Sequence, residues 1–432
     1  MRNTLRLITT AATLFIFSLT AEAGIPLQSF ITPGGHPVVL LKDDIQDSVA
    51  IALAFKCGLA CDGEKEYAAG LLAPSLSMDG AGGQSSSEIY ENFMDTGAQL
   101  NFSANSDETY LSLSAPSSGL DDAVKIANTV LTKPDFPESK LAQKRERLAT
   151  AVDETRLDAD IKAQLAFIDA AVGPSSYDHY FSPQAADIRQ VTTEQMRGWL
   201  ERHVATDGVL ISVVGNIEQE KAGEVVDKLL AGLPQKSDDT KFPVLSFQAP
   251  KAEPIVVQGD GGKQVVVNFG MIGNRPERLD EWLGGVMLAK IFADGQRSRL
   301  FTQVREASGQ TYGLESDFNF YEQLGMNRVK GRLGTEGLDQ SLAVIRKSWD
   351  QFRAEGPTEN EIKEARLSMF NELNNIMRDH QLAAERIRDY LTGHWSVAEL
   401  ARMPEIIRDV DLHDKVLRER FFTTDPITVI VK

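Results

Sequence analysis

The sequence predicts an α+β fold of two homologous domains, each a β-sheet covered on one face by helices. Three observations support this prediction. Segments with strand and helix periodicity alternate along the chain, short runs of the first half recur in the second, and a stretch without periodicity separates the halves.

In the first half, Asp107 to Ala115 alternates between polar and apolar side chains, as a half-buried strand does. Residues Asp121 to Leu131 place their apolar side chains on one helical face, and Glu138 to Asp160 is typical of one long helix. A β-branched run, Val209 to Val214, predicts a strand close to the end of this half.

The second half gives a similar series of elements. Gln264 to Gly270 predicts a strand, Leu279 to Phe292 an apolar helix, and Glu359 to Arg378 a long helix. The β-branched run Ile427 to Val431 predicts a last strand.

Short runs recur between the halves at nearly constant spacing. Gly119-Leu120-Asp121 is repeated as Gly337-Leu338-Asp339, and Ile188-Arg189-Gln190-Val191 is echoed by Ile407-Arg408-Asp409-Val410. The runs that end at Val191 and at Val410 each continue into a predicted helix containing an Arg and then into a β-branched strand. These echoes indicate a duplicated domain.

A linker separates the copies. Residues Gln235 to Pro254 carry Lys, Ser, Asp and prolines without periodicity. We therefore expect an N-terminal domain over 24–236, a linker over 237–254 and a C-terminal domain over 255–432.

Residues 1–23 are typical of an export signal. Arg2 and Arg6 precede an apolar run from Leu7 to Leu19, and Ala21-Glu22-Ala23 offers small residues for cleavage before Gly24. The alternative is an uncleaved anchor, but the run is shorter than the roughly 18 residues that a spanning helix needs. We expect an exported, periplasmic protein without a membrane attachment after cleavage.

The net charge of −17 disfavours nucleic acids and anionic membrane surfaces as partners, because both are polyanions. It is compatible with cationic peptides and equally with a role in solubility.

The two cysteines, Cys57 and Cys61, can form a disulfide in an oxidising compartment. Along a straight strand, residues four apart lie roughly 13 Å from each other, which is beyond bridging range. A turn at Gly58 is therefore required, and the sequence leaves bonded and free states open. No second Cys/His cluster completes a metal site with this pair.

The C-terminal half contains one specific motif. The run from Ser298 to Tyr312, SRLFTQVREASGQTY, resembles the SRLFxxVRExxGxxY segment of the insulinase/pitrilysin family of zinc peptidases. The first half resembles the N-terminal domain of the same family, with Gly70 to Gly82 in place of its metal-binding helix. The resemblance covers nearly the whole chain after residue 23 and implies that the two domains form half of a clam-shell chamber.

In active members that helix carries H-x-x-E-H, in which two histidines bind zinc and the glutamate polarises the attacking water. The matching positions here are Ala73, Leu76 and Ser77, none of which is a useful zinc ligand or base. We expect Pro74 to limit the helix to starting near that residue. Asp153 or Glu154 falls near the position of the family's distal carboxylate ligand.

Other catalytic patterns are missing from the sequence. The histidines show neither metal-ligand spacing nor an H-E-x-x-H frame, which leaves only a site assembled from distant segments. A G-x-S-x-G nucleophile motif is absent, and Gly259 to Lys263 is a turn rather than a phosphate-binding loop. The histidines are His36, His179, His203, His380, His394 and His413.

The resemblance also implies a substrate-binding pair. Family members use an Arg and a Tyr seven residues apart to contact substrate near the zinc, and Arg305 and Tyr312 match them. The forked donors of an arginine suit a peptide carbonyl or a developing oxyanion, and a phenol adds a hydrogen bond. We expect Arg299, the neighbouring basic residue, to be structural.

Together these features predict a non-catalytic, substrate-binding subunit that completes the chamber of a zinc-bearing partner acting on peptides or unfolded segments. We expect zinc in the partner and no cofactor on this chain. Two alternatives stay open: a peptide-binding or scaffold protein of the same fold without a role in proteolysis, and an autonomous peptidase with an unrecognised metal site.

Overall fold

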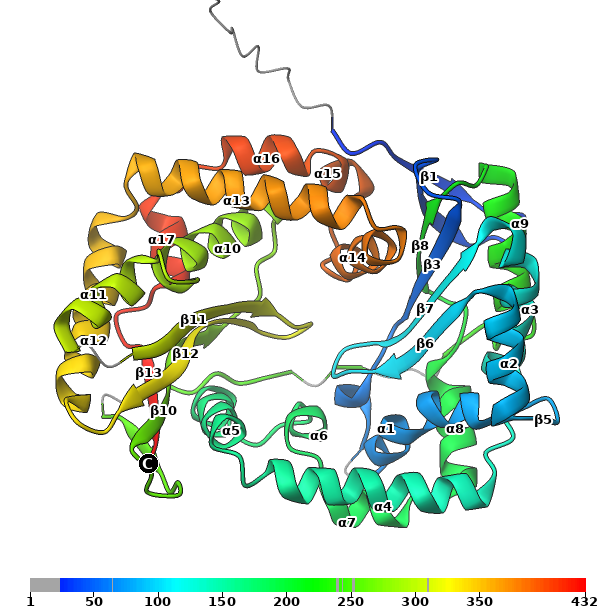
Figure 1. Cartoon of the computed structure of the whole chain (residues 1–432), viewed down its shortest axis with the longest axis horizontal. Helices are drawn as coiled ribbons and strands as arrows, with labels where there is room; N and C mark the ends of the chain where they lie inside the picture. Colours follow the sequence, from blue (N-terminus) through cyan, green and yellow to red (C-terminus); the bar gives the residue numbers. More distant parts are fainter. Residues whose placement is uncertain (1–23, 64, 238–240, 243, 251–252, 309–310) are drawn as a thin grey trace, which may run out of the picture.

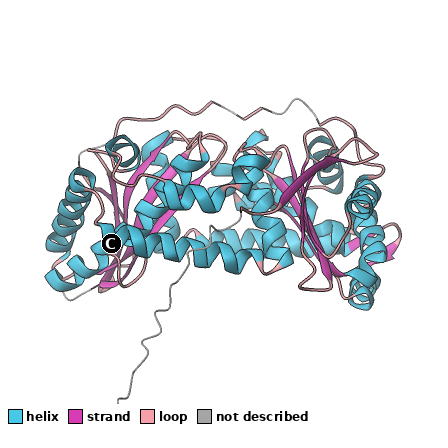
Figure 2. Ribbon diagram, turned by 90° about the horizontal axis from the view of Figure 1, so that it is seen from above, coloured by secondary structure: helices cyan, strands magenta, loops and turns pink. Residues whose placement is uncertain are grey.

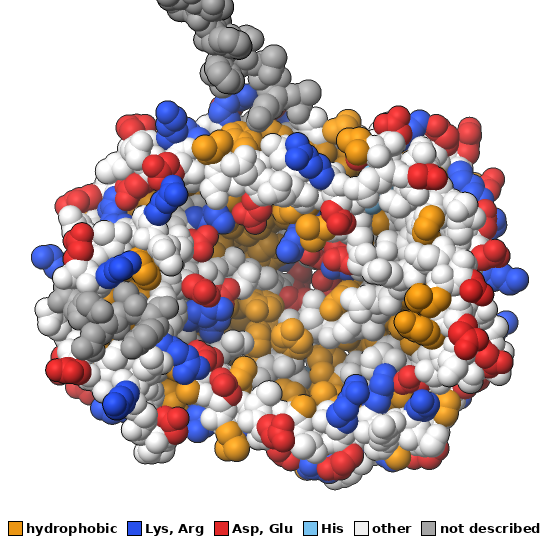
Figure 3. Space-filling view, viewed as in Figure 1, with side chains coloured by type: hydrophobic (Ala, Val, Ile, Leu, Met, Phe, Trp, Pro, Cys, Tyr) orange, Lys and Arg blue, Asp and Glu red, His pale blue; other side chains and the backbone are white. Residues whose placement is uncertain are grey.

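The computed structural model describes residues 24–432 except 64, 238–240, 243, 251–252 and 309–310. The expected signal peptide lies outside the described residues. Two sheets stand on opposite sides of the molecule, with helices around them (Figure 1), and the space-filling view shows a central hollow between them (Figure 3). Viewed from above, the sheets form separate layers, and the chain crosses between the domains along one edge (Figure 2).

The sheet of the first domain has the strand order β1-β2-β8-β3-β7-β6. Neighbouring strands are antiparallel except for the parallel pair β2 and β8. The strands are β1 (Leu27–Ile31), β2 (Pro37–Lys42), β3 (Ser48–Phe55), β6 (Gln99–Ala104), β7 (Thr109–Pro116) and β8 (Leu210–Gly215).

The second sheet repeats this topology. Its order β9-β13-β10-β12-β11 corresponds strand for strand to β2-β8-β3-β7-β6, including the parallel pair β9 and β13. The predicted duplication is thus confirmed in the fold. The strands are β9 (Ile255–Val257), β10 (Gln264–Gly273), β11 (Thr311–Phe320), β12 (Gly325–Gly334) and β13 (Ile427–Val431).

Helices surround both sheets. In the first domain they are α1 (Tyr67–Leu76), α2 (Ser86–Thr96), α3 (Leu120–Thr132), α4 (Glu138–Thr155), α5 (Ala159–Val172), α6 (Asp178–Phe181), α7 (Ala185–Gln190), α8 (Thr193–His203) and α9 (Gln219–Leu230). In the second they are α10 (Leu279–Ala293), α11 (Arg299–Ser308), α12 (Leu338–Glu355), α13 (Glu359–Met377), α14 (His380–Thr392), α15 (Val397–Ala401), α16 (Met403–Asp409) and α17 (Lys415–Phe421). A small ribbon, β4 (Gly80–Ala81) and β5 (Gln84–Ser85), follows α1. Within the described residues, no helix is long and apolar enough to cross a membrane.

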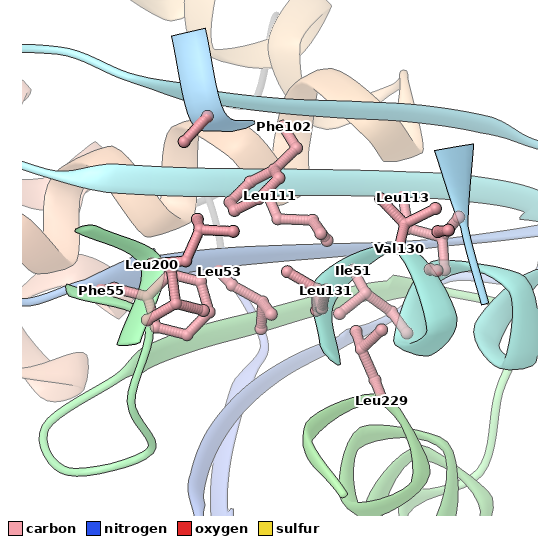
Figure 4. Packing of buried hydrophobic residues seen from close by; sticks show 14 of the residues in the cluster. Ile51, Leu53, Phe55, Phe102, Leu111, Leu113, Val130, Leu131, Leu200 and Leu229 are labelled. Carbon is pink, nitrogen blue, oxygen red and sulfur yellow. The ribbon is translucent and has the colours of Figure 1, made fainter. Parts of the chain in front are cut away.

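Strand β3 shows how each sheet is buried on both faces. Because side chains alternate along a strand, Ile51 and Leu53 point into the core beneath α3 and α8, while Ala50 and Ala52 point to the opposite face. Figure 4 shows the first set packed against Leu111 of β7 and its neighbours.

One helix from each domain covers the remaining face of the other domain's sheet. Helix α14 packs on β3 and β8, where the Ser212 hydroxyl donates a hydrogen bond to the Ala384 carbonyl at 2.6 Å. Helix α5 packs on the second sheet, with Phe167 fully buried beside Val266 and Val429. Each domain's own helices cover one face, as predicted, and this exchange joins the domains.

Two predicted element boundaries are wrong for local reasons. The long helix expected over Glu138 to Asp160 ends at Thr155, because the Asp158 carboxylate accepts the backbone N–H groups of Asp160 and Ile161 and caps α5. The strand expected from Asp107 begins at Thr109, because the Asn105 side chain accepts two backbone N–H groups and closes a turn.

Candidate functional site

The residues at the family's zinc-motif positions lie in the core. Ala73, Leu76 and Ser77 are each 0 % exposed. The Ser77 hydroxyl donates a hydrogen bond to the Ala73 carbonyl at 2.9 Å, so its only polar group is used inside the helix end. These three side chains cannot serve as zinc ligands.

The expectation that Pro74 marks the start of this helix is wrong. Helix α1 begins at Tyr67 and contains Pro74 in its interior. Eight of its ten residues are buried, so tertiary packing outweighs the lost backbone hydrogen bond. Gly70 permits that packing, because a Cβ there would lie 2.6 Å from the Trp199 ring.

Other polar groups near α1 are engaged in ion pairs. The Lys144 ammonium lies 2.7 Å from the Asp79 carboxylate and donates to the Ser75 carbonyl at 3.0 Å. Asp153 pairs with Arg189 at 3.0 Å on the surface of α4, and the next residue, Glu154, is exposed. Over the described part of the chain, no group of three or more His, Cys, Asp or Glu side chains is arranged to hold a metal ion. The donor set does not fit zinc.

Cys57 and Cys61 form a disulfide, with their Cα atoms 6.2 Å apart. A 3₁₀ turn over Leu59–Cys61 folds the chain back after Gly58, as the spacing requires. The bonded loop binds the β6–β7 hairpin, because the Leu59 N–H donates to the Asn105 carbonyl at 2.9 Å. It therefore holds the hairpin tip in place.

The Arg/Tyr pair belongs to the other domain. Arg305 is exposed on the last turn of α11, and Tyr312 lies in β11 with its side chain outside the described structure. Helices α11 and α1 stand on opposite sides of the central hollow (Figure 1), so the structure does not bring the pair to the zinc-motif positions. Arg299 forms a two-point ion pair with Glu361, which agrees with a structural role.

The central hollow contains a cavity of about 510 Å³ between the domains. It lies where the tips of the β6–β7 and β11–β12 hairpins meet helix α14. Figure 3 shows this hollow with hydrophobic and acidic side chains at its floor. The aromatic residues that line it are Tyr110, Tyr180, Trp282, Phe318, Phe320, Tyr321 and Tyr390.

Two acidic residues of the β6–β7 hairpin have carboxyl groups with raised pKa values. Burial raises the pKa of Asp107 to about 6 and that of Glu108 to about 7, despite the opposing effects of hydrogen bonds on Asp107 and of Arg388 on Glu108. Asp107 Oδ1 and Glu108 Oε2 are fully covered and lack a hydrogen-bond partner among the described residues. No motif in the sequence points to a functional role for either residue.

The duplicated domain could have pointed to this hairpin turn. Asp107 lies at the turn between β6 and β7, and Glu322 lies at the corresponding turn between β11 and β12. An acidic residue at the same turn of both copies marks the place where the copies meet.

Comparison with known proteins decides the family. Residues 38–167 match the model of insulinase, peptidase family M16, and residues 190–369 match that of the peptidase M16 inactive domain. The chain belongs to the insulinase family. Among curated relatives, an uncharacterised zinc protease of Rickettsia felis is 21 % identical over 285 residues, 65 % of this chain and 67 % of the relative. The uncharacterised zinc protease YmxG of Bacillus subtilis is 20 % identical over 348 residues, 79 % of this chain and 82 % of the relative.

Solved structures share the fold. A peptidase M16 inactive domain from Pseudomonas fluorescens superposes with a TM-score of 0.86 and 19 % identity, covering 94 % of this chain and 98 % of that one. The periplasmic protease PqqL of Escherichia coli superposes with a TM-score of 0.79 and 16 % identity. It covers 99 % of this chain, but this chain corresponds to only 48 % of PqqL.

Proposed function

We propose that this chain is the non-catalytic, substrate-binding subunit of a periplasmic zinc metalloendopeptidase, and that it completes the chamber of a zinc-bearing partner. The observation that carries the proposal is the loss of zinc ligands from helix α1. Its three zinc-motif positions are buried and lack ligands, in a chain that keeps both domains of an insulinase-family half-chamber.

The comparison of lengths supports the need for a partner. PqqL is about twice as long as this chain, which superposes on about half of it. A zinc-bearing subunit of the same family would supply a second half and the metal.

Two sheet edges provide places for a peptide. In the described structure, β6 and β11 are the terminal strands of their sheets, and residues of both line the central cavity. An extended peptide that pairs with such an edge gains backbone hydrogen bonds with little demand on its sequence. This suits peptides or unfolded segments as substrates.

Arg305 and Tyr312 would act across the chamber on a substrate held at the partner's zinc. Zinc there would supply the activated water, and this chain would supply hydrogen bonds to the substrate. The test mixes the purified chain with its zinc-bearing subunit and measures peptide turnover and complex formation. Arg305→Ala should lower turnover about 10²-fold, as loss of an oxyanion donor does, and leave assembly unchanged.

Arg297→Ala is the matched control, because Arg297 is an exposed arginine just before α11. Tyr312→Phe should also lower turnover. Full activity of both Arg305→Ala and Tyr312→Phe would remove the assigned role of the pair. Peptide binding without activity alongside any zinc subunit would favour a scaffold instead, and chelator-sensitive activity of the isolated chain would refute the proposal.

A further inference from the structure

The central cavity has more acidic than basic groups in its lining. Five carboxyl groups line it, together with only two guanidinium groups, those of Arg386 and Arg388. Seven aromatic rings make up much of the remaining wall. Rings and carboxylates together form the kind of site that attracts organic cations, because the face of an aromatic ring carries negative charge.

Only some of the five carboxyl groups have a basic partner. Glu322 pairs with Arg275 at 2.9 Å, and Asp389 pairs with Arg388. Within the described residues, Asp107, Glu108 and Glu385 have no Lys or Arg group within salt-bridge distance. Above the raised pKa values of Asp107 and Glu108, about 6 and about 7, both groups are ionised and the cavity keeps uncompensated negative charge.

The charge lies where solvation by water is weak. Asp107 Oδ1 and Glu108 Oε2 have lost contact with water and have gained no hydrogen bond in exchange. A buried charge without a partner is costly, so a cation that enters the cavity gains more attraction there than it would at the surface.

Two of the cavity rings already bind guanidinium groups of the protein itself. The Arg388 guanidinium lies 4.8 Å from the centre of the Tyr110 ring, and that of Arg275 lies 5.7 Å from the Phe320 ring. The rings of Tyr180 and Tyr321 also line the cavity, and they have no such partner among the described contacts. Both rings pack against Phe181, and the Tyr180 ring, which is 40 % exposed, remains accessible to a cation from outside.

We propose that this cavity binds the guanidinium or ammonium group of a basic side chain in the bound peptide. A peptide is favoured over a free amine because the edge strands β6 and β11 contribute Asn101 and Asn319 to the cavity wall. A peptide paired with either edge would direct alternate side chains toward the cavity. The volume suits one long side chain and its flanking backbone. This inference rests on the proposed function as a peptide-binding subunit.

The test measures binding to the full isolated chain by titration calorimetry at pH 8, above the pKa values of about 6 for Asp107 and about 7 for Glu108, without a zinc-bearing subunit. The two probes are alanine-rich hexapeptides with either arginine or citrulline at one central position. Citrulline keeps the shape of arginine and removes its charge. We expect the arginine peptide to bind at least about tenfold more tightly, and the difference to shrink in high salt.

Glu108→Gln and Asp107→Asn should each reduce that difference to about threefold or less, because each removes one uncompensated charge without removing the cavity. Glu91→Gln, a change at an exposed glutamate of α2, is the matched control and should bind like the wild type. Thermal unfolding of each variant checks that it is folded.

A third probe, spermidine, separates the two sources of an organic cation. Tight spermidine binding that needs Glu108, with equal affinities for the two peptides, would show that the cavity takes free polyamines, and the proposal would be wrong. Equal affinities for the peptides without spermidine binding would also refute it. Because this test measures binding and not activity, the two proposals can fail separately. The role in proteolysis can be wrong although the cavity binds the arginine peptide, and it can be right although the cavity does not.

Discussion

The carboxylate of Asp107 accepts a hydrogen bond from the backbone N–H of Glu322 at 2.9 Å. This contact joins the tip of the β6–β7 hairpin in the first domain to the tip of the β11–β12 hairpin in the second. Beside it, the Gln323 N–H donates to the hydroxyl of Tyr177 at 3.0 Å. Corresponding turns of a duplicated domain thus meet at the wall of the central cavity and set the spacing between the two edge strands.

The first prediction concerns pH and Glu108. Burial raises the pKa of its carboxyl group from 4.5 to about 7, although Arg388 opposes this while Asp389 and Asp107 reinforce it. The folded state therefore binds the proton more tightly than the unfolded state. The stability that this group contributes is complete below about pH 4.5 and is lost as the pH rises through 7.

Glu108→Gln cannot ionise, so it should exceed the wild type in free energy of unfolding by about 1–3 kcal/mol at pH 8. The difference should vanish near pH 4.5. Urea unfolding at both pH values measures it, with Glu91→Gln as the control. A variant that is less stable than the wild type at pH 8 would contradict the prediction.

The second prediction concerns the disulfide. Cys57 and Cys61 close a short loop, and a loop of about five residues should contribute about 2 kcal/mol to stability. The double change Cys57→Ser and Cys61→Ser should lower the free energy of unfolding by that amount. It should also increase hydrogen exchange at the amides of Leu59 and Ala60, which donate to the hairpin. Unchanged exchange at these two amides would show that the hairpin holds the loop without the bond.

The elements that followed from the sequence are those with strong periodicity. The strand beginning at Gln264 and the helices beginning at Leu279 and Glu359 start where their patterns predicted, and the repeated runs revealed the duplicated topology. A local hydrogen bond and tertiary packing account for two exceptions. Asp158 ended the long helix by capping the next one, and packing kept Pro74 inside α1.

One part of the candidate site could be predicted from the sequence and the other could not. Ala73, Leu76 and Ser77 could be found because a motif places ligands at fixed spacing on one helix. The cavity could not, because its walls come from segments more than 200 residues apart that meet only through tertiary packing, as Asp107 and Glu322 do. The burial that alters the pKa of Glu108 is likewise a property of the assembled domains.

The third prediction concerns the exchanged helices. Phe167 of α5 is fully buried against the sheet of the other domain. Phe167→Ala should therefore cost about 3–5 kcal/mol, as loss of a large buried side chain does. Asp169→Ala, an exposed change on the same helix, should cost little. Because the exchange couples the domains, calorimetry should show one unfolding transition for the wild type, and two well-separated transitions would show that the domains are independent.

The last prediction concerns restoration of the zinc motif. The triple variant Ala73→His, Leu76→Glu and Ser77→His places large polar groups at three fully buried positions. Overpacking and unsatisfied polar groups should together cost at least about 4 kcal/mol. Of the two candidates for the distal ligand, Asp153 is already paired with Arg189 at the surface. We expect a poorly folded protein by circular dichroism, without stoichiometric zinc by elemental analysis, whereas Ala73→Ser alone should fold normally. A native spectrum with one zinc ion per chain would mean that α1 still faces an open chamber and that only its ligands have been lost.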